Sequence, residues 1–195
     1  MSQIQRRRVI QAAAAGTVLS QAPFVRAAGK AKVYRTALIG SGWWGMNILR
    51  EAMKAGTAKV VALCDVDMDK LEIAAEEVQD LSGDQPKTYT DFRELLDNEE
   101  IEIAIVATPD HWHALNTIAA IEAGAHIFVE KPTGHTIGES QAMLAAARAN
   151  NRVVQVGLHR RIGPHYQSGM KFLKDGGAGK IGMVKAFVHS RGGQE

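Results

Sequence analysis

Three glycines and an aspartate in the first third of the chain have the residue types and spacing of a dinucleotide-binding site. Residues 40–45 read Gly-Ser-Gly-Trp-Trp-Gly, which fits the pattern G-x-G-x-x-G. In such a loop Gly40 makes a tight turn, Gly42 lets the backbone approach a pyrophosphate, and Gly45 allows a helix to pack closely on a strand. Asp65 follows Gly45 by twenty residues, where a carboxylate can accept hydrogen bonds from an adenosine ribose.

Asp65 also predicts which dinucleotide is bound. A carboxylate at this position accepts from a ribose hydroxyl and repels a 2′-phosphate, so we expect NAD and regard NADP as less favoured. The alternative is a glycine-rich turn without a ligand, with Asp65 a solvated residue at a strand end. We expect Trp43 and Trp44 to cover the diphosphate. The candidate cofactor residues of this segment are Gly40, Ser41, Gly42, Trp43, Trp44, Gly45 and Asp65.

The elements that must hold this site alternate between strands and helices from residue 33 onward. Apolar runs suited to strands lie at 33–39, 59–63, 102–107, 126–129 and 153–156, and a short strand is expected at 87–89. Helical patterns lie between them, at 44–55, 68–81, 91–96, 113–123 and 137–150. This alternation predicts an α/β fold in which a doubly wound, parallel Rossmann sheet spans residues 33–157.

Three further segments with polar residues follow predicted strand ends. They are residues 107–113, 130–132 and 157–161. Ligands of a doubly wound sheet bind beyond the carboxyl ends of its strands. We therefore expect these segments and the glycine loop to converge on one edge of the sheet.

Three motifs in this order closely resemble those of the Gfo/Idh/MocA family of oxidoreductases, whose best-known members act on sugars and inositols. They are the glycine loop, the sequence VATPDHWH at 106–113 and the sequence VEKPTGHT at 129–136. The resemblance runs from about Tyr34 to the end of the chain. It implies an N-terminal Rossmann domain and then a larger α/β domain with an open, mostly antiparallel sheet that carries much of the substrate pocket.

The resemblance also implies roles for single residues. Lys131 would lie beside the nicotinamide and the substrate hydroxyl, where its ammonium group can hydrogen-bond that oxygen and assist proton removal. A solvated loop lysine is the alternative. Thr108 and Pro109 would line the ribose and diphosphate of the nicotinamide half, and Glu130 belongs to the same cofactor set. His113 is assigned there too, although packing or capping explains a histidine in a first helical turn equally well.

Arg160 and Tyr166 lie where members of that family begin to touch the substrate or the nicotinamide. An arginine can fork onto carboxylate or hydroxyl oxygens, and a surface salt bridge is the alternative. No metal site is expected, because His111, His113 and His135 have no convincing carboxylate or cysteine partner at ligand spacing.

The last residues resemble the beginning of a second domain. Residues 182–190 are similar to its first strand, so we expect 158–195 to be the start of an incomplete C-terminal α/β substrate domain. The family's aspartate and histidine pair, spaced D-x-x-x-H, would fall beyond Glu195. We therefore expect a piece that holds the cofactor half, is inactive alone, and forms a homo-oligomer in its full-length form.

Residues 1–29 resemble a twin-arginine export signal. Arg6 and Arg7 are followed by Val9 and Ile10, a mildly apolar stretch and small residues. We expect a periplasmic or otherwise exported protein, with a basic tail on a cytoplasmic protein as the alternative. The apolar stretch is too short and too rich in alanine to predict a membrane span.

Composition excludes several other classes. The chain is 46% hydrophobic and 23% charged, which is typical of a globular protein. Its formal net charge is +2, and the four arginines before Ala28 account for more than this excess, so nothing predicts a nucleic-acid partner. Cys64 is the single cysteine, so no intramolecular disulfide can form.

Three functions fit these observations. The first is an NAD-dependent oxidoreductase that transfers hydride to or from a sugar, polyol or sugar derivative and holds its cofactor tightly. The second is an NAD-dependent glycoside-cleaving enzyme of the same superfamily, in which transient oxidation of a ring hydroxyl acidifies the neighbouring C–H and no net redox change results. The third is a noncatalytic dinucleotide-binding protein or an inactive fragment.

Overall fold

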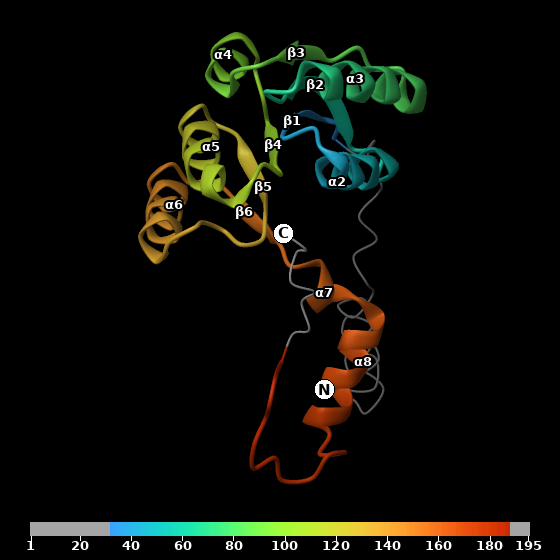
Figure 1. The fold of residues 1–195 in the computed structure, drawn as a ribbon, viewed down its shortest axis with the longest axis vertical. Helices are drawn as coiled ribbons and strands as arrows, with labels where there is room; N and C mark the ends of the chain where they lie inside the picture. The colour runs from blue at the N-terminus through green and yellow to red at the C-terminus, as the bar shows by residue number, and fades with distance from the viewer. Residues whose placement is uncertain (1–31, 188–195) are drawn as a thin grey trace, which may run out of the picture. The chain divides into compact units, whose positions relative to one another are not determined.

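A computed structural model describes residues 32–187, and six parallel strands form one sheet within them (Figure 1). The strand order is β3-β2-β1-β4-β5-β6, and every neighbouring pair is parallel. This confirms the doubly wound Rossmann sheet. The strands are β1 (Tyr34–Ile39), β2 (Ala58–Cys64), β3 (Lys87–Tyr89), β4 (Ile103–Val106), β5 (His126–Glu130) and β6 (Val154–Gly157).

Helices connect these strands and continue after the last one. They are α2 (Trp43–Lys54), α3 (Met68–Ser82), α4 (Phe92–Asn98), α5 (Asp110–Glu122), α6 (Ile137–Ala149), α7 (His159–Ile162) and α8 (Pro164–Lys174). Within residues 32–187 no helix is both long and apolar enough to cross a bilayer. The expected export signal at 1–29 lies outside the described residues.

Alternate residues of the central strands face opposite helical layers. In β1, Leu38 packs with α2 and α3, whereas Ala37 and Ile39 pack with α4. In β4, Ile105 shares the α2 side, and Ala104 packs with α5 and α6. Figure 1 shows α2 on one side of the sheet and α5 and α6 on the other. The central strands are therefore predicted correctly from their apolar runs, because central strands of a parallel sheet are buried on both faces.

Side-chain caps fix where three of the helices begin. The carboxylates of Asp67 and Asp91 accept from backbone N–H groups in α3 and α4, and Thr136 forms a reciprocal capping box with Glu139 in α6. Gly83 takes a left-handed conformation, with φ of 77°, directly after α3.

One helix begins earlier than its sequence pattern predicts. We expected a start at His113, but α5 begins at Asp110, directly after Pro109. Asp110 places a carboxylate in the first turn, where its negative charge interacts favourably with the positive end of the helix dipole. The correction puts His113 inside the helix, facing the protein interior.

The segment after β6 was the least predictable part of the described chain. Two helices, α7 and α8, follow that strand, and neither is anticipated above. Residues 182–187 do not form a strand, and 188–190 lie outside the described residues. The second domain therefore stays a prediction.

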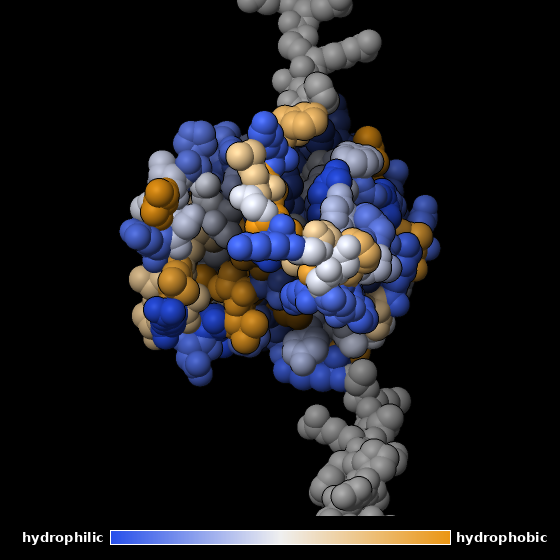
Figure 2. Space-filling model, turned by 90° about the horizontal axis from the view of Figure 1, so that it is seen from below, coloured by the Kyte–Doolittle hydropathy of each residue, from blue (hydrophilic) through white to orange (hydrophobic). Residues whose placement is uncertain are grey.

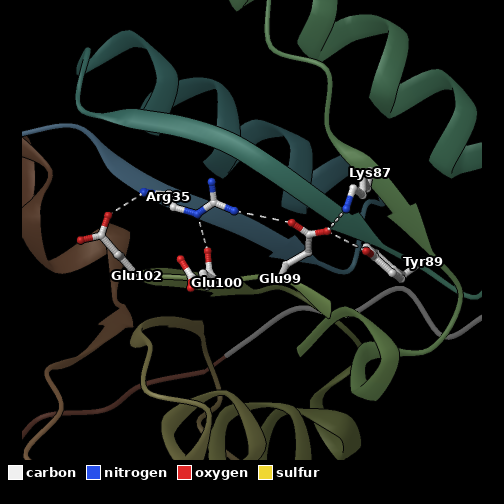
Figure 3. A network of polar contacts seen from close by, with 6 residues as sticks. All are labelled: Arg35, Lys87, Tyr89, Glu99, Glu100 and Glu102. Atoms are coloured by element: carbon white, nitrogen blue, oxygen red, sulfur yellow. Dashed lines mark hydrogen bonds and ion pairs between the residues drawn. The ribbon is translucent and has the colours of Figure 1, made fainter. Parts of the chain in front are cut away.

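A network of charged residues joins β1, β3 and the turn before β4 (Figure 3). The Glu99 carboxylate accepts from Lys87 Nζ at 2.6 Å and from the Tyr89 hydroxyl at 2.8 Å, and it lies 3.5 Å from the Arg35 guanidinium. Its side chain is only 7% exposed. The hydrogen bond from Lys87 holds the pKa of Glu99 below its usual range. This network ties the amino end of β4 to the sheet edge.

Candidate dinucleotide-binding site

The glycine loop and the segments after β2, β4 and β5 lie at one edge of the sheet. The parallel register pairs Ile39 with both Cys64 and Val106, and it pairs Val106 with Val129. All four strands therefore end at the same level. The residues predicted to bind a dinucleotide follow directly, so the fold brings their segments together as expected.

The three loop glycines have different structural requirements. Gly40 has φ of 98°, and a Cβ there would lie 2.7 Å from backbone atoms of Ala107 and Thr108. A Cβ on Gly45 would lie 2.0 Å from the Gly40 carbonyl oxygen. By contrast, a Cβ on Gly42 would meet nothing within 4 Å. Close packing therefore requires glycine at positions 40 and 45, whereas the space beside Gly42 is open.

The helix that follows this open space has no side-chain cap. Gly42 is the N-cap of α2, and its position provides no side-chain cap for the helix. The first turn of α2 also contains no acidic residue. Free N–H groups and the positive end of a helix dipole bind a diphosphate. The open space at Gly42 and the uncapped start of α2 therefore fit the diphosphate of NAD.

Asp65 links the glycine loop to the end of β2. One carboxylate oxygen accepts from the Ser41 N–H at 2.8 Å, and the other accepts from the Asp67 N–H at 3.1 Å. A carboxylate oxygen has more than one acceptor site, so Asp65 can still accept from a ribose hydroxyl. Its position fits the adenosine ribose, and its contact with Ser41 is an additional role that spacing alone did not predict.

His113 joins the loops that follow β4 and β5. It is 2% exposed, and its ring lies between two backbone carbonyls, with Nε2 2.8 Å from the Thr108 oxygen and Nδ1 2.6 Å from the Pro132 oxygen. Asn116, one turn further along α5, donates from Nδ2 to Thr108 Oγ1 at 3.3 Å. The described contacts of His113 are therefore with the protein, and a contact with cofactor stays a prediction. The sequence analysis missed Asn116. Its spacing of three residues from His113, which puts both on one face of a helix, is the one pattern that could have indicated it.

Lys131 is exposed at the carboxyl end of β5, and its contact with a substrate stays a prediction. Its backbone N–H donates to Glu130 Oε2 at 3.0 Å. Glu130 is only 4% exposed, and a Cβ on Gly157 would lie 2.3 Å from its carboxylate. Gly157 therefore makes room for Glu130, a requirement that the sequence analysis missed.

Aromatic rings lie between the glycine loop and α7. Trp43 is 77% exposed, and its ring centroid is 5.4 Å from that of Trp44. The Trp44 ring is in turn 5.2 Å from the ring of His159. Further along, Arg160 Nη1 donates to the Tyr166 hydroxyl at 3.1 Å. The two residues predicted to touch substrate thus bond to each other, and both are exposed.

The exposed histidines beside the site do not form a metal centre. His111 and His135 each approach a carboxylate oxygen of Asp110 at 3.8 Å. Across residues 32–187 no group of three or more potential ligands is arranged to hold a metal ion.

Comparison with known proteins decides the family. The model of the Gfo/Idh/MocA oxidoreductase family, described as having an NAD-binding Rossmann fold, matches residues 34–158. The chain belongs to this family. Its cofactor is NAD, as both the matching model and the geometry of the glycine loop indicate.

Relatives in this family are named for several different activities. A glycosyl hydrolase family 109 protein of Stenotrophomonas maltophilia is 34% identical over 143 residues, which are 70% of this chain and 32% of that protein. Levoglucosan dehydrogenase of Pseudarthrobacter phenanthrenivorans is 36% identical over 110 residues, 56% of this chain and 28% of the relative. The chain spans under half the length of these relatives.

Solved structures of the family share the fold. Myo-inositol 2-dehydrogenase of Lactobacillus plantarum superposes with a TM-score of 0.67 and 31% identity, covering 77% of this chain and 43% of that one. Scyllo-inositol dehydrogenase of Lactobacillus casei, solved with NAD(H) and scyllo-inositol, gives 0.68 at 25% identity over the same shares.

Proposed function

We propose that this chain is the cofactor-binding part of an NAD-dependent oxidoreductase that transfers hydride to or from a sugar, polyol or sugar derivative. The observation that carries the proposal is the open space at Gly42 in front of the uncapped start of α2, with Lys131 exposed at the same edge of the sheet. The inositol and levoglucosan dehydrogenases among the relatives support a polyhydroxylated substrate.

Different residues of this chain would bind the cofactor and act on the substrate. The first turn of α2 binds the diphosphate, and Asp65 accepts from the adenosine ribose. Bound NAD supplies the hydride acceptor. Lys131 hydrogen-bonds the reacting hydroxyl and passes on its proton, which is the usual task of a positioned acid–base group. His113 holds the loop that begins at Lys131 against the loop after β4.

Turnover by the full-length protein that the gene encodes tests this proposal. NADH formation would be followed with inositols and aldoses as substrates. Lys131→Ala should lower turnover by a factor of about 10²–10⁴ while leaving NAD binding nearly intact. Lys59→Ala is the matched control, because Lys59 is an exposed lysine in β2 near the opposite edge of the sheet. Undiminished turnover in Lys131→Ala would show that this lysine is only part of the scaffold.

The family 109 relative supports a second candidate function. This relative is named as a glycosyl hydrolase, and it matches 70% of this chain. In a glycoside-cleaving enzyme NAD would be reduced and restored within one cycle. Sugar release without net NADH accumulation distinguishes this function from the dehydrogenase.

Export with a retained cofactor is part of the proposal. Arg6 and Arg7 resemble a twin-arginine signal, and that route carries folded proteins. An enzyme in a compartment without a nicotinamide pool must keep its NAD, which requires nanomolar affinity, about −12 kcal/mol. The mature full-length protein, a proposed homo-oligomer, should release close to one NAD per chain on denaturation. Purified protein that contains no NAD, together with its recovery in the cytoplasmic fraction, would contradict export.

A further inference from the structure

A buried amide of helix α5 contacts the loop that follows β4. Hydrophilic side chains cover much of the protein surface, as Figure 2 shows for one face, but Asn116 is only 2% exposed. Its Oδ1 atom is buried and has no hydrogen-bond partner among residues 32–187. An unpaired acceptor in the protein interior costs free energy that an apolar side chain would avoid. The presence of an amide at this position therefore calls for an explanation.

The amide of Asn116 determines what the hydroxyl group of Thr108 can do. Asn116 Nδ2 donates to Thr108 Oγ1 at 3.3 Å, so the hydroxyl oxygen accepts and its single proton stays available. Within the described part of the chain, Thr108 Oγ1 makes no other hydrogen bond. If the amide were reversed, its oxygen would accept the proton of Thr108 instead. The observed orientation leaves Thr108 able to donate.

Thr108 lies against the glycine loop, two residues after β4 ends. A Cβ on Gly40 would come within 2.7 Å of the backbone nitrogen of Thr108. Helix α5 holds Thr108 at two points, because His113 Nε2 lies 2.8 Å from its carbonyl oxygen and Asn116 bonds its hydroxyl. The half-buried hydroxyl of Thr108 is therefore fixed beside the dinucleotide site.

We propose that Asn116 is a positioning residue that makes Thr108 a hydrogen-bond donor to NAD. The inference rests on the proposed dinucleotide site. Oxygen atoms of a diphosphate can only accept hydrogen bonds, so a hydroxyl group beside them must donate. Asn116 occupies a lone pair of Thr108 Oγ1 from inside the protein and directs the proton outward, without itself touching the cofactor. Because α5 holds the amide, the donor is oriented before NAD binds, and less conformational freedom is lost on binding.

A double-mutant cycle on NAD affinity tests this proposal with the purified chain. Asn116→Leu keeps the branched shape of the side chain but removes the amide, and it should weaken NAD binding about fivefold or more. Thr108→Val removes the hydroxyl and should weaken binding at least as much. In a Thr108→Val background Asn116→Leu should have no further effect, because Asn116 acts only through that hydroxyl. A general loosening of the fold would instead lower the affinity by the same factor in both backgrounds.

Thr117→Val is the matched control. Thr117 is the next residue of α5, is fully buried, and has a hydroxyl oxygen without a partner among residues 32–187. The substitution removes a buried polar group from the same helix, so NAD affinity should stay at the parent value. Urea unfolding shows whether each variant keeps the fold. We expect Asn116→Leu to be about as stable as the parent, because it removes an unpaired acceptor together with one hydrogen bond.

Asn116→Asp tests the direction of the hydrogen bond. A protonated carboxyl group can donate to Thr108 Oγ1 as the amide does, whereas a carboxylate can only accept and would take the proton of Thr108. NAD affinity of this variant should therefore fall relative to the parent as pH rises and the carboxyl group ionises. Thr108→Val should abolish this difference in pH dependence.

Three results would overturn the inference and leave the dinucleotide site intact. The first is unchanged NAD affinity in Asn116→Leu. The second is an equal loss of affinity with and without the Thr108 hydroxyl. The third is an Asn116→Asp protein that matches the parent at every pH at which it is folded, because the amide oxygen would then face Thr108. A folded parent chain that binds no NAD would overturn both the site and the inference.

Discussion

Two glycine-to-alanine changes in one loop separate a packing requirement from a ligand requirement. A methyl group at Gly45 would lie 2.0 Å from the Gly40 carbonyl oxygen, and real contacts of this kind rarely fall below 3.0 Å. The start of α2 and the turn after β1 must therefore move apart by about 1 Å, in the cost range of overpacking, about 1–3 kcal/mol. Gly45→Ala should lower the free energy of unfolding by that amount.

Gly42→Ala is predicted to have the opposite profile. Its Cβ meets no protein atom within 4 Å, and the backbone of Gly42, with φ of −66° and ψ of 176°, is open to alanine. Stability should stay unchanged or rise by about 0.4–1 kcal/mol. If the diphosphate fills the space beside Gly42, NAD affinity should fall at least tenfold, about 1.4 kcal/mol.

Urea unfolding and NAD titration of the three proteins provide the assay. The expected result is a destabilised Gly45→Ala and a stable Gly42→Ala that binds NAD poorly. Full NAD affinity in Gly42→Ala would refute the placement of the diphosphate. A Gly45→Ala protein as stable as the parent would refute the packing argument.

Three further predictions concern single buried groups. His113→Phe should lower the free energy of unfolding by about 1–3 kcal/mol, because at least one of the two carbonyls loses its hydrogen-bond donor, and an unchanged urea midpoint would contradict the proposed link between the loops. Glu99→Gln should be less stable than the parent at neutral pH. Because Lys87 lowers the pKa of Glu99, this advantage of the parent should be lost as pH falls through the folded-state value, and a constant difference would argue against the ion pair. Burial raises the pKa of Cys64 to about 12, so a thiol reagent at pH 8 should label it only in step with urea unfolding, and rapid labelling of the folded chain would contradict its burial.

The elements of the sheet could be predicted because local signals agree with the fold. The apolar runs at β1 and β4 must be buried on both faces, and Asp67 and Asp91 mark helix starts by capping them. Gly40 and Gly45 were also correctly assigned to a turn and a close packing contact, since their spacing follows from the geometry of a strand, a turn and a helix.

The remaining features depend on contacts between distant segments. His113 and Asn116 reach the loop after β4, and His113 also reaches the loop after β5, which no local pattern encodes. The need for a glycine at 157 arises from Glu130, 27 residues earlier. Helix α8 has apolar residues on one face, but its sequence does not tell which surface that face packs on.

Equilibrium titration of the purified chain with NAD and NADP, after removal of any bound nucleotide, is the most direct test of the cofactor site. The site predicts one NAD per chain, bound more tightly than NADP. Asp65→Ser should weaken NAD binding by about 1–3 kcal/mol and reduce the preference over NADP. A folded parent chain that binds neither nucleotide, or an Asp65→Ser protein with unchanged affinity for both, would contradict the assignment.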